Sequence, residues 1–369
     1  MGYDEHMILG DVLEGAVVMA PMTKGGNLPY RRLCVELGAR VLMSEMTVAR
    51  RLKQKRRSEF ALIRKAPEEP VFGVQLAGTN PDEMGWAAAL VESRGADFVD
   101  VNIGCPIDYF TSKGLGATLG RQPKRIQRIV EGMKRAVTGV PITVKIRLGW
   151  NDESRNYLEQ AKAAVDGGAD AVFVHGRTRN ARYRQAADWD AIGEVVRAVP
   201  VPVVGNGDML FPADVDAARA RSGCAGVMAG RGVLIKPWLF REAVAGYWDI
   251  TAEERVGVYR RYVDLAREHW GEDDHGLARV REFLRWHAGF WCRYAPRRAD
   301  GTWPGLQTRE SMAFVRSPLE ALLARGDDAA LDWLTERLLL REAISPEEAP
   351  PPGPSDSRRA SDREEVAEG

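Results

Sequence analysis

Apolar and polar residues follow two alternating patterns along the chain: short, nearly continuous apolar runs are each followed by a longer segment with helical spacing. Eight runs are rich in Val, Ile, Leu and Ala, as buried parallel strands are. From the first run to the last is 210 positions in seven steps, or 30 per step, the length of one strand-helix unit. The runs cover residues 16–20, 41–44, 71–76, 98–102, 142–146, 171–174, 201–204 and 226–229.

Proline marks the start of several helical segments. Because the first turn of a helix has no use for a backbone N–H, helices are predicted to open at Pro81, Pro123 and Pro212. Gly38 and Gly95 are predicted to end two other helical segments, because glycine is common just after the last residue of a helix. Strands and helices alternating in this way predict an α/β fold, a (β/α)8 TIM barrel over residues 9–246. A doubly wound sheet is the rival, but no G-x-G-x-x-G follows the first strand.

The pattern changes after residue 250. Long helical segments follow with no strand-like run between them, over 253–268, 275–294, 317–323 and 329–342. They predict a second, all-helical domain over 251–344. Residues 345–369 are rich in Pro, Glu, Ser, Asp and Arg, which predicts a disordered acidic tail.

Composition narrows the class of protein. Of 369 residues, 45% are hydrophobic and 28% charged, as in soluble globular proteins. No apolar stretch approaches the length of a membrane span, and residues 1–15 carry four acidic side chains where a signal peptide needs a basic start. We therefore expect a cytoplasmic protein with no membrane partner. The four cysteines include no C-x-x-C pair, which argues against a disulfide framework or a cysteine zinc site.

The net charge is zero but unevenly distributed. Residues 345–369 hold seven acidic residues and three arginines, which leaves the rest of the chain at +4. Residues 50–65 hold eight Lys or Arg and one Glu. Residues 279–298 hold six arginines and one Glu. Such runs are often only solvated faces, but two of them also suit a polyanion such as RNA.

A cysteine follows the fourth run, in Val99-Asp-Val-Asn-Ile-Gly-Cys-Pro-Ile107. Gly104 and Pro106 end the strand pattern, so Cys105 is predicted on a loop at a strand's carboxyl end. In parallel α/β folds ligands bind at this edge, and the segment Lys113-Gly-Leu-Gly-Ala117 can lie over one there. The alternative is that Cys105 is a small core residue.

Polar or turn-forming residues stand at the same end of most other runs. Lys145 and His175 interrupt apolar strands, although an edge ion pair and a buried structural histidine are the alternatives. A lysine at a barrel strand end can also form a Schiff base, as in aldolases. Glycine-rich turns follow the seventh and eighth runs, at 205–208 and 230–232, where barrels bind phosphate through backbone N–H groups.

Eight motifs agree in order and spacing with one known family. They are Ala20-Pro-Met22, Val74-Gln-Leu76, Asn102-Ile-Gly-Cys-Pro106, Lys113-Gly-Leu-Gly-Ala117, Val144-Lys-Ile-Arg147, His175-Gly-Arg-Thr178, Gly205-Asn-Gly-Asp208 and Gly230-Arg231. Together they resemble the tRNA-dihydrouridine synthases, and Cys105-Pro-Ile-Asp108 is most similar to the eukaryotic type 3 version. The resemblance implies a barrel that holds FMN, NADPH as reductant, and a helical domain that helps bind tRNA.

The resemblance also implies roles for single residues. Cys105 would be the catalytic acid: hydride passes from the flavin to C6 of uracil while the thiol, whose free pKa is about 8.5, protonates C5. Lys145 would stabilise the reduced ring by its charge. The other cofactor-binding residues implied are Pro21, Met22, Gln75, Asn102, His175, Asn206, Gly207, Asp208, Gly230 and Arg231.

A uridine inside tRNA must be flipped out to reach a flavin, with cations on the phosphates. Lys113, Arg177 and Arg179 are the implied RNA contacts, and residues 279–298 would extend that surface. Two other functions stay open: a flavin-dependent dehydrogenase of free pyrimidines or dihydroorotate, and a non-catalytic tRNA-binding protein. We expect a monomer without a metal site.

Overall fold

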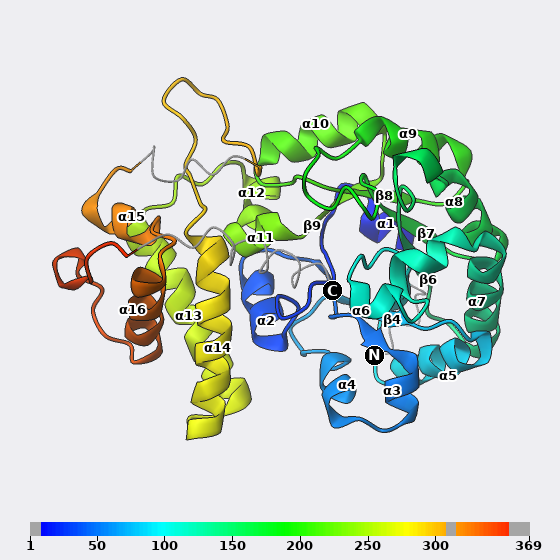
Figure 1. Ribbon diagram of the computed structural model, residues 1–369, viewed down its shortest axis with the longest axis horizontal. Helices are drawn as coiled ribbons and strands as arrows, with labels where there is room; N and C mark the ends of the chain where they lie inside the picture. The colour runs from blue at the N-terminus through cyan, green and yellow to red at the C-terminus, as the bar shows by residue number, and fades with distance from the viewer. Residues whose placement is uncertain (1–8, 308–314, 354–369) are drawn as a thin grey trace, which may run out of the picture.

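The structure is a computed structural model that describes residues 9–307 and 315–353 (Figure 1). Its centre is a parallel sheet whose strands follow the predicted apolar runs to within a few residues. The strands are β1 (Val17–Met19), β2 (Val41–Met43), β3 (Thr47–Val48), β4 (Val71–Ala77), β5 (Phe98–Asn102), β6 (Ile142–Arg147), β7 (Ala171–His175), β8 (Val203–Asn206) and β9 (Gly226–Ala229).

Eight of these strands form a closed ring. β1 pairs with both β2 and β9, and β2 pairs in turn with β4, so the sheet has no free edge between them. The two-residue β3 extends the end of β4. Closure confirms the (β/α)8 prediction and excludes the open doubly wound sheet, which would leave two edge strands.

Helices cover the outside of the barrel (Figure 1). α5, α7 and α10 have proline in the first turn, as predicted, and the Asn80 side chain caps α5 by accepting from the Glu83 N–H at 2.9 Å. The helices up to β9 are α1 (Leu9–Leu13), α2 (Leu28–Glu36), α3 (Ala49–Lys53), α4 (Arg57–Leu62), α5 (Pro81–Glu92), α6 (Asp108–Thr111), α7 (Pro123–Ala136), α8 (Tyr157–Asp166), α9 (Trp189–Ala198) and α10 (Pro212–Ser222), with 3-10 turns η1 (Gly116–Arg121) and η2 (Asp152–Ser154).

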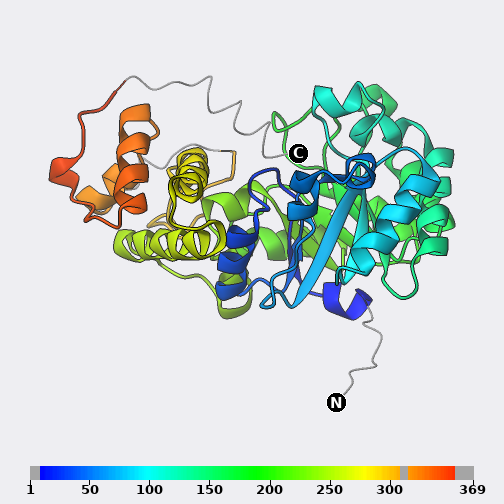
Figure 2. The same cartoon turned by 90° about the horizontal axis from the view of Figure 1, so that it is seen from below.

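A helical part follows β9 and lies beside the barrel (Figure 2). It comprises α11 (Arg231–Ile235), α12 (Leu239–Ala245), α13 (Ala252–Trp270), α14 (Asp274–Trp291), α15 (Pro318–Leu323) and α16 (Asp328–Leu339). Tyr30 of α2 packs against Tyr262 and Phe283, and one apolar core runs through both parts. The division into domains at 9–246 and 251–344 therefore stays a prediction.

The predicted tail is described only at its beginning. Residues 345–353 include η4 (Pro346–Glu348), and Arg325 donates to the carbonyls of Pro350 and Pro351 at 2.6 and 3.1 Å. Residues 354–369, on which most of the disorder prediction falls, lie outside the described residues. Within the described part of the chain, none of the helices combines the length and apolar character that crossing a bilayer requires.

Candidate active site

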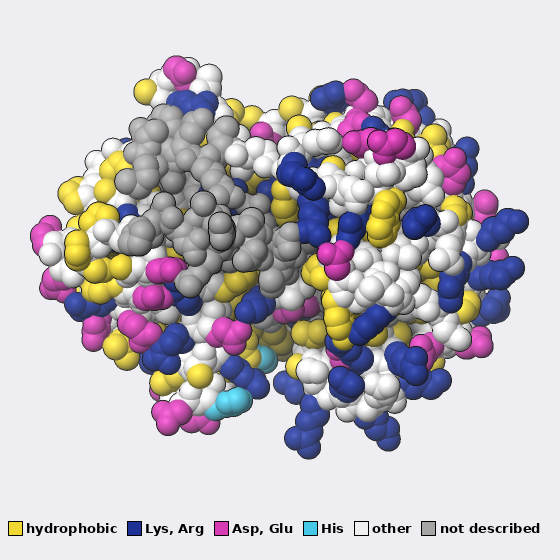
Figure 3. Space-filling model, in the orientation of Figure 1, with side chains coloured by type: hydrophobic (Ala, Val, Ile, Leu, Met, Phe, Trp, Pro, Cys, Tyr) yellow, Lys and Arg dark blue, Asp and Glu magenta, His cyan; other side chains and the backbone are white. Residues whose placement is uncertain are grey.

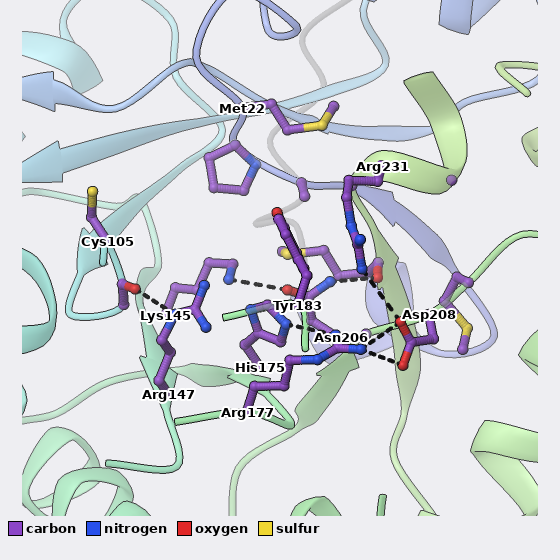
Figure 4. Close-up of a pocket in the computed structure, with 18 of the residues that line it drawn as sticks. Met22, Cys105, Lys145, Arg147, His175, Arg177, Tyr183, Asn206, Asp208 and Arg231 are labelled. Carbon is purple, nitrogen blue, oxygen red and sulfur yellow. Dashed lines mark hydrogen bonds and ion pairs between the residues drawn. The ribbon is translucent and has the colours of Figure 1, made fainter. Parts of the chain in front are cut away.

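A pocket opens at the carboxyl ends of the barrel strands (Figure 4). Cys105, Arg177 and every cofactor-binding residue implied by the sequence line this pocket. Lys113 and Arg179 do not. The other lining residues are Ala20, Gly104, Arg147, Tyr183, Met209, Met228, Gly232 and Leu306.

One side of the pocket, at the ends of β8 and β9, is cationic. Arg177 Nη2 lies 2.6 and 2.5 Å from the two carboxylate oxygens of Asp208, and Arg231 Nη2 lies 3.4 Å from the same group. The Arg231 guanidinium also stacks 3.4 Å from the ring centre of Tyr183. Burial acts against ionisation of Asp208, but the charge and hydrogen bonds of Arg177 lower its pKa. Asp208 therefore holds both arginines in place.

His175 is neutral in this setting. Burial, together with the nearby charges of Arg147, Lys145 and Arg177, holds the pKa of His175 well below its usual value. Arg177 Nη1 lies 3.2 Å from His175 Nε2. Because a guanidinium can only donate, Nε2 accepts and the ring proton is on Nδ1. His175 thus presents a hydrogen-bonding ring, and it does not act as an acid near neutral pH.

Lys145 reaches from β6 past the neighbouring strand β7 to the end of β8. Its Nζ donates to Asn206 Oδ1 at 3.1 Å, and Asn206 Nδ2 donates to the Met228 carbonyl at 2.8 Å. Because the Met228 carbonyl can only accept, the Asn206 nitrogen faces Met228 and the Asn206 oxygen faces the lysine. The ammonium group is thereby held at the pocket floor, and Lys145 as a whole is 9% exposed.

The opposite side of the pocket carries Cys105 on a loop fixed by a chain of hydrogen bonds. Asp100, inside the barrel, accepts from Thr143 Oγ1 at 2.7 Å and from Gln75 Nε2 at 2.8 Å. Gln75 Oε1 then accepts from Asn102 Nδ2 at 2.7 Å, and Asn102 Oδ1 accepts from the Cys105 N–H at 2.9 Å. Because the Gln75 and Thr143 groups donate to Asp100, the Gln75 amide is oriented with its oxygen toward Asn102, and each later bond in the chain follows from that orientation.

Neighbouring residues complete the support of this loop. Arg147 Nε donates to the Gly104 carbonyl at 2.7 Å, and the Ala117 N–H donates to the Cys105 carbonyl at 3.0 Å. Gly116, at φ +59°, passes so close that a Cβ there would lie 2.5 Å from the Cys105 oxygen. The predicted glycine-rich segment therefore packs on Cys105, whose side chain is 1% exposed and clusters with Met46 and Ala77.

Comparison with known proteins identifies the family. The profile of the dihydrouridine synthase family, abbreviated Dus, matches residues 18–288, most of the chain. The chain belongs to the dihydrouridine synthase family. Proteins named tRNA-dihydrouridine(47) synthase match this family member at 39% identity in Homo sapiens, over 90% of this chain and 51% of that protein, and at 38% in Coprinopsis cinerea, over 87% and 50%.

This family member spans about half the length of the curated relatives it matches. Their names include the cofactor designation NAD(P)(+). Solved structures match as well, among them histamine dehydrogenase from Rhizobium sp. 4-9, at TM-score 0.46 and 15% identity over 68% of this chain and 48% of that chain.

The three residues expected to contact RNA in this dihydrouridine synthase family member do not lie together in one place. Arg177 lines the pocket at 2% exposure and is paired with Asp208, so its burial does not agree with a contact to RNA phosphates outside the pocket. Arg179 lies 4.7 Å from the Trp150 ring and is paired with Asp108. Lys113 lies 3.5 Å from the Tyr109 ring, at a second hollow.

Three residues of the site were not singled out by sequence. Arg147 stands in the same motif as Lys145, and its position two residues further along β6 places it on the same face of the strand. Asp100 breaks the apolar pattern of β5 in the same way. Tyr183 lies in a loop without periodicity, so no pattern in the sequence indicates that it covers Arg231.

Proposed function

We propose that this chain reduces a uridine of tRNA to 5,6-dihydrouridine, with FMN as bound cofactor and NADPH as reductant. One observation carries the proposal: in a member of this family, a single pocket has a buried thiol on one side and a cationic floor on the other. Such a pocket suits a reaction that gives a proton at one place and holds negative charge at another.

The residues of the pocket fit FMN. Its lining holds four cationic side chains, Lys145, Arg147, Arg177 and Arg231, against one carboxylate, so it favours an anionic group such as the flavin phosphate. The segments after β8 and β9 pack closely on each other, since Gly207 has φ +143° and a Cβ on Gly232 would lie 1.7 Å from the Met209 oxygen. These segments, with Asn206, Gly230 and Arg231, would hold the ribityl phosphate.

The isoalloxazine ring would lie toward the centre of the pocket. Pro21 and Met22 would contact its face. Gln75 and Asn102 would donate to its edge with the second N–H of each amide, since the first is used within the hydrogen-bond chain. His175 would donate from Nδ1 or contact the bound base. Asp208 would act through Arg177 and Arg231.

The chemistry then divides between the two sides. FMN, when bound, supplies the hydride that adds at C6 of uracil. Cys105 would give a proton from Sγ to C5, and Met46 and Ala77 keep water away from the thiol. Lys145, held by Asn206, would place a fixed positive charge beside the ring.

The test is to incubate the FMN-loaded protein with NADPH and unmodified tRNA and to map dihydrouridine along the product. The first position to inspect is uridine 47, the position in the names of the relatives. Reduction that needs both NADPH and tRNA is expected. Two results would contradict the proposal. One is reduction of free uracil or oxidation of dihydroorotate without tRNA. The other is a flavin-free protein that only binds tRNA. The monomeric, metal-free state also stays a prediction.

A further inference from the structure

A second hollow lies beside the Cys105 loop, between the α3–α4 segment and α6. Its wall includes Phe110 and Ala77, which belong to the same apolar cluster as Cys105. A single layer of side chains therefore separates this hollow from the thiol. The full lining is Val48, Arg50, Arg51, Gln54, Arg56, Ala77, Gly78, Thr79, Glu83, Tyr109, Phe110, Lys113 and Leu115.

The charge of this hollow is only partly neutralised by the protein. Four cations line it, of which Arg51 is paired with Glu59, and Glu83 is the one acidic residue in the lining. Arg50 and Arg56 are exposed, and among the residues that the structure describes their side chains have neither an acidic partner nor a hydrogen bond. Lys53, Lys55 and Arg57 are exposed close by. Figure 3 shows Lys and Arg side chains gathered over α3 and α4 in the lower part of the view.

An aromatic ring stands among these cations. Tyr109 is 50% exposed, and its hydroxyl accepts from Arg51 Nη2 at 2.9 Å. Arg51 is itself anchored by Glu59 at 3.1 Å, so the ring is held from the protein side. Lys113 Nζ lies 3.5 Å from the ring centre, and its hydrogen bond and charge lower the pKa of Tyr109. An exposed aromatic ring beside a basic groove is a combination that proteins use to bind single-stranded nucleic acid.

We propose that this hollow binds the RNA strand next to the target uridine. Arg50 and Arg56 contact its phosphates. Tyr109, with Lys113 over one face of its ring, presents the exposed part of the ring to an unpaired base. The proposal rests on the proposed function: a uridine flipped into the pocket stays joined to its neighbours, so these must lie immediately outside, beside Cys105.

The second basic stretch, residues 279–298, differs from the hollow because two of its arginines are paired with acidic side chains. Arg281 pairs with Glu336 at 2.6 Å, and Arg285 pairs with Asp328 and Asp332. These arginines join α14 to α16 and have their charge compensated within the protein. Reversing them would break the packing of two helices, so the α3–α4 hollow is the better place to look for phosphate contacts.

The test compares two double variants of equal charge change. Arg50→Glu with Arg56→Glu alters the hollow, and Arg135→Glu with Lys162→Glu alters exposed cations on α7 and α8 on the outside of the barrel. Binding of unmodified tRNA is measured over a range of salt concentrations. Each lost phosphate contact lowers the slope of log K against log salt by about 0.7 to 0.9, so the hollow variant should lose about 1.5 and the control should keep its slope.

A second pair of variants tests the ring. Tyr109→Ala should weaken tRNA binding by about 5- to 150-fold, the size of one base-aromatic stack, while Tyr109→Phe should bind nearly as the parent does. Bound flavin content reports that each variant is folded.

Two results would overturn the site. One is a hollow variant whose tRNA binding and salt slope match those of the control variant. The other is unchanged tRNA binding with a raised KM for NADPH, which would assign the hollow to the phosphate of the reductant. The proposed function fails separately, if the unaltered protein binds tRNA but forms no dihydrouridine.

Discussion

The two sides of the pocket are built from different chemistry. On the β8–β9 side, Arg177 and Arg231 are buried and share the carboxylate of Asp208. On the β5 side, Cys105 packs against apolar groups, and its loop is held by amide and backbone hydrogen bonds. Under the proposed function, one side would hold negative charge and the other would deliver a proton. Substitutions on the two sides should therefore separate the steps of the reaction.

The largest effect is expected on the thiol side. Cys105→Ala should slow dihydrouridine formation by about 10²- to 10⁴-fold, because the reaction at C5 loses its acid. Cys105→Ser should recover little, since a hydroxyl is a far weaker acid than a thiol. Steady-state formation of dihydrouridine per mole of bound flavin measures the effect. Cys224→Ala, at another buried thiol, is the matched control and should keep the parental turnover.

Lys145→Met tests the cationic side. Loss of the charge should slow reduction of the bound flavin by NADPH by about 10²-fold, the usual size for one electrostatic contact to a reacting group. Stopped-flow bleaching of the flavin absorbance measures it. Bleaching at the parental rate would show that the Lys145 ammonium lies away from the flavin ring. The two sides would then not differ in their effect on flavin reduction.

Asp100 should act on the thiol side alone, through the hydrogen-bond chain. Asp100→Leu leaves the Gln75 and Asn102 amides free to turn, so dihydrouridine formation should fall about tenfold, the value of one buried hydrogen bond. Asp100→Asn, which can still accept from Gln75, should restore most of it. Alkylation of Cys105, followed by mass spectrometry relative to Cys34, should accelerate only in the Leu variant. Equal acceleration at both thiols would indicate general loosening instead.

The same carboxyl should make stability depend on pH. Burial raises the pKa of Asp100 to about 7, against the hydrogen bonds from Thr143 and Gln75. The folded protein then keeps this proton to a higher pH than the unfolded chain does, so the free energy of unfolding should fall as pH rises from about 4 through 7. Urea unfolding at pH 5 and pH 8 should show a smaller difference in Asp100→Asn than in the parent.

Much of the fold could be predicted, because buried parallel strands are nearly continuous apolar runs and proline marks the helix starts. The pocket could be predicted as well, since the carboxyl ends of barrel strands converge wherever those strands are found. Which charges neutralise one another could not be predicted. Arg177 pairs with Asp208, 31 residues away, and Arg281 with Glu336, 55 residues away, and no local spacing encodes those contacts.

The central claim is that cofactor reduction and proton delivery use opposite sides of one pocket. The most direct measurement follows the two half-reactions separately by rapid mixing, in folded, FMN-loaded Cys105→Ala. Bleaching by NADPH should proceed at the parental rate, because it needs only the cationic side. Reoxidation by unmodified tRNA should be slower by at least about 10²-fold. Reoxidation at the parental rate would contradict the account, because Cys105 would then not be the source of the proton.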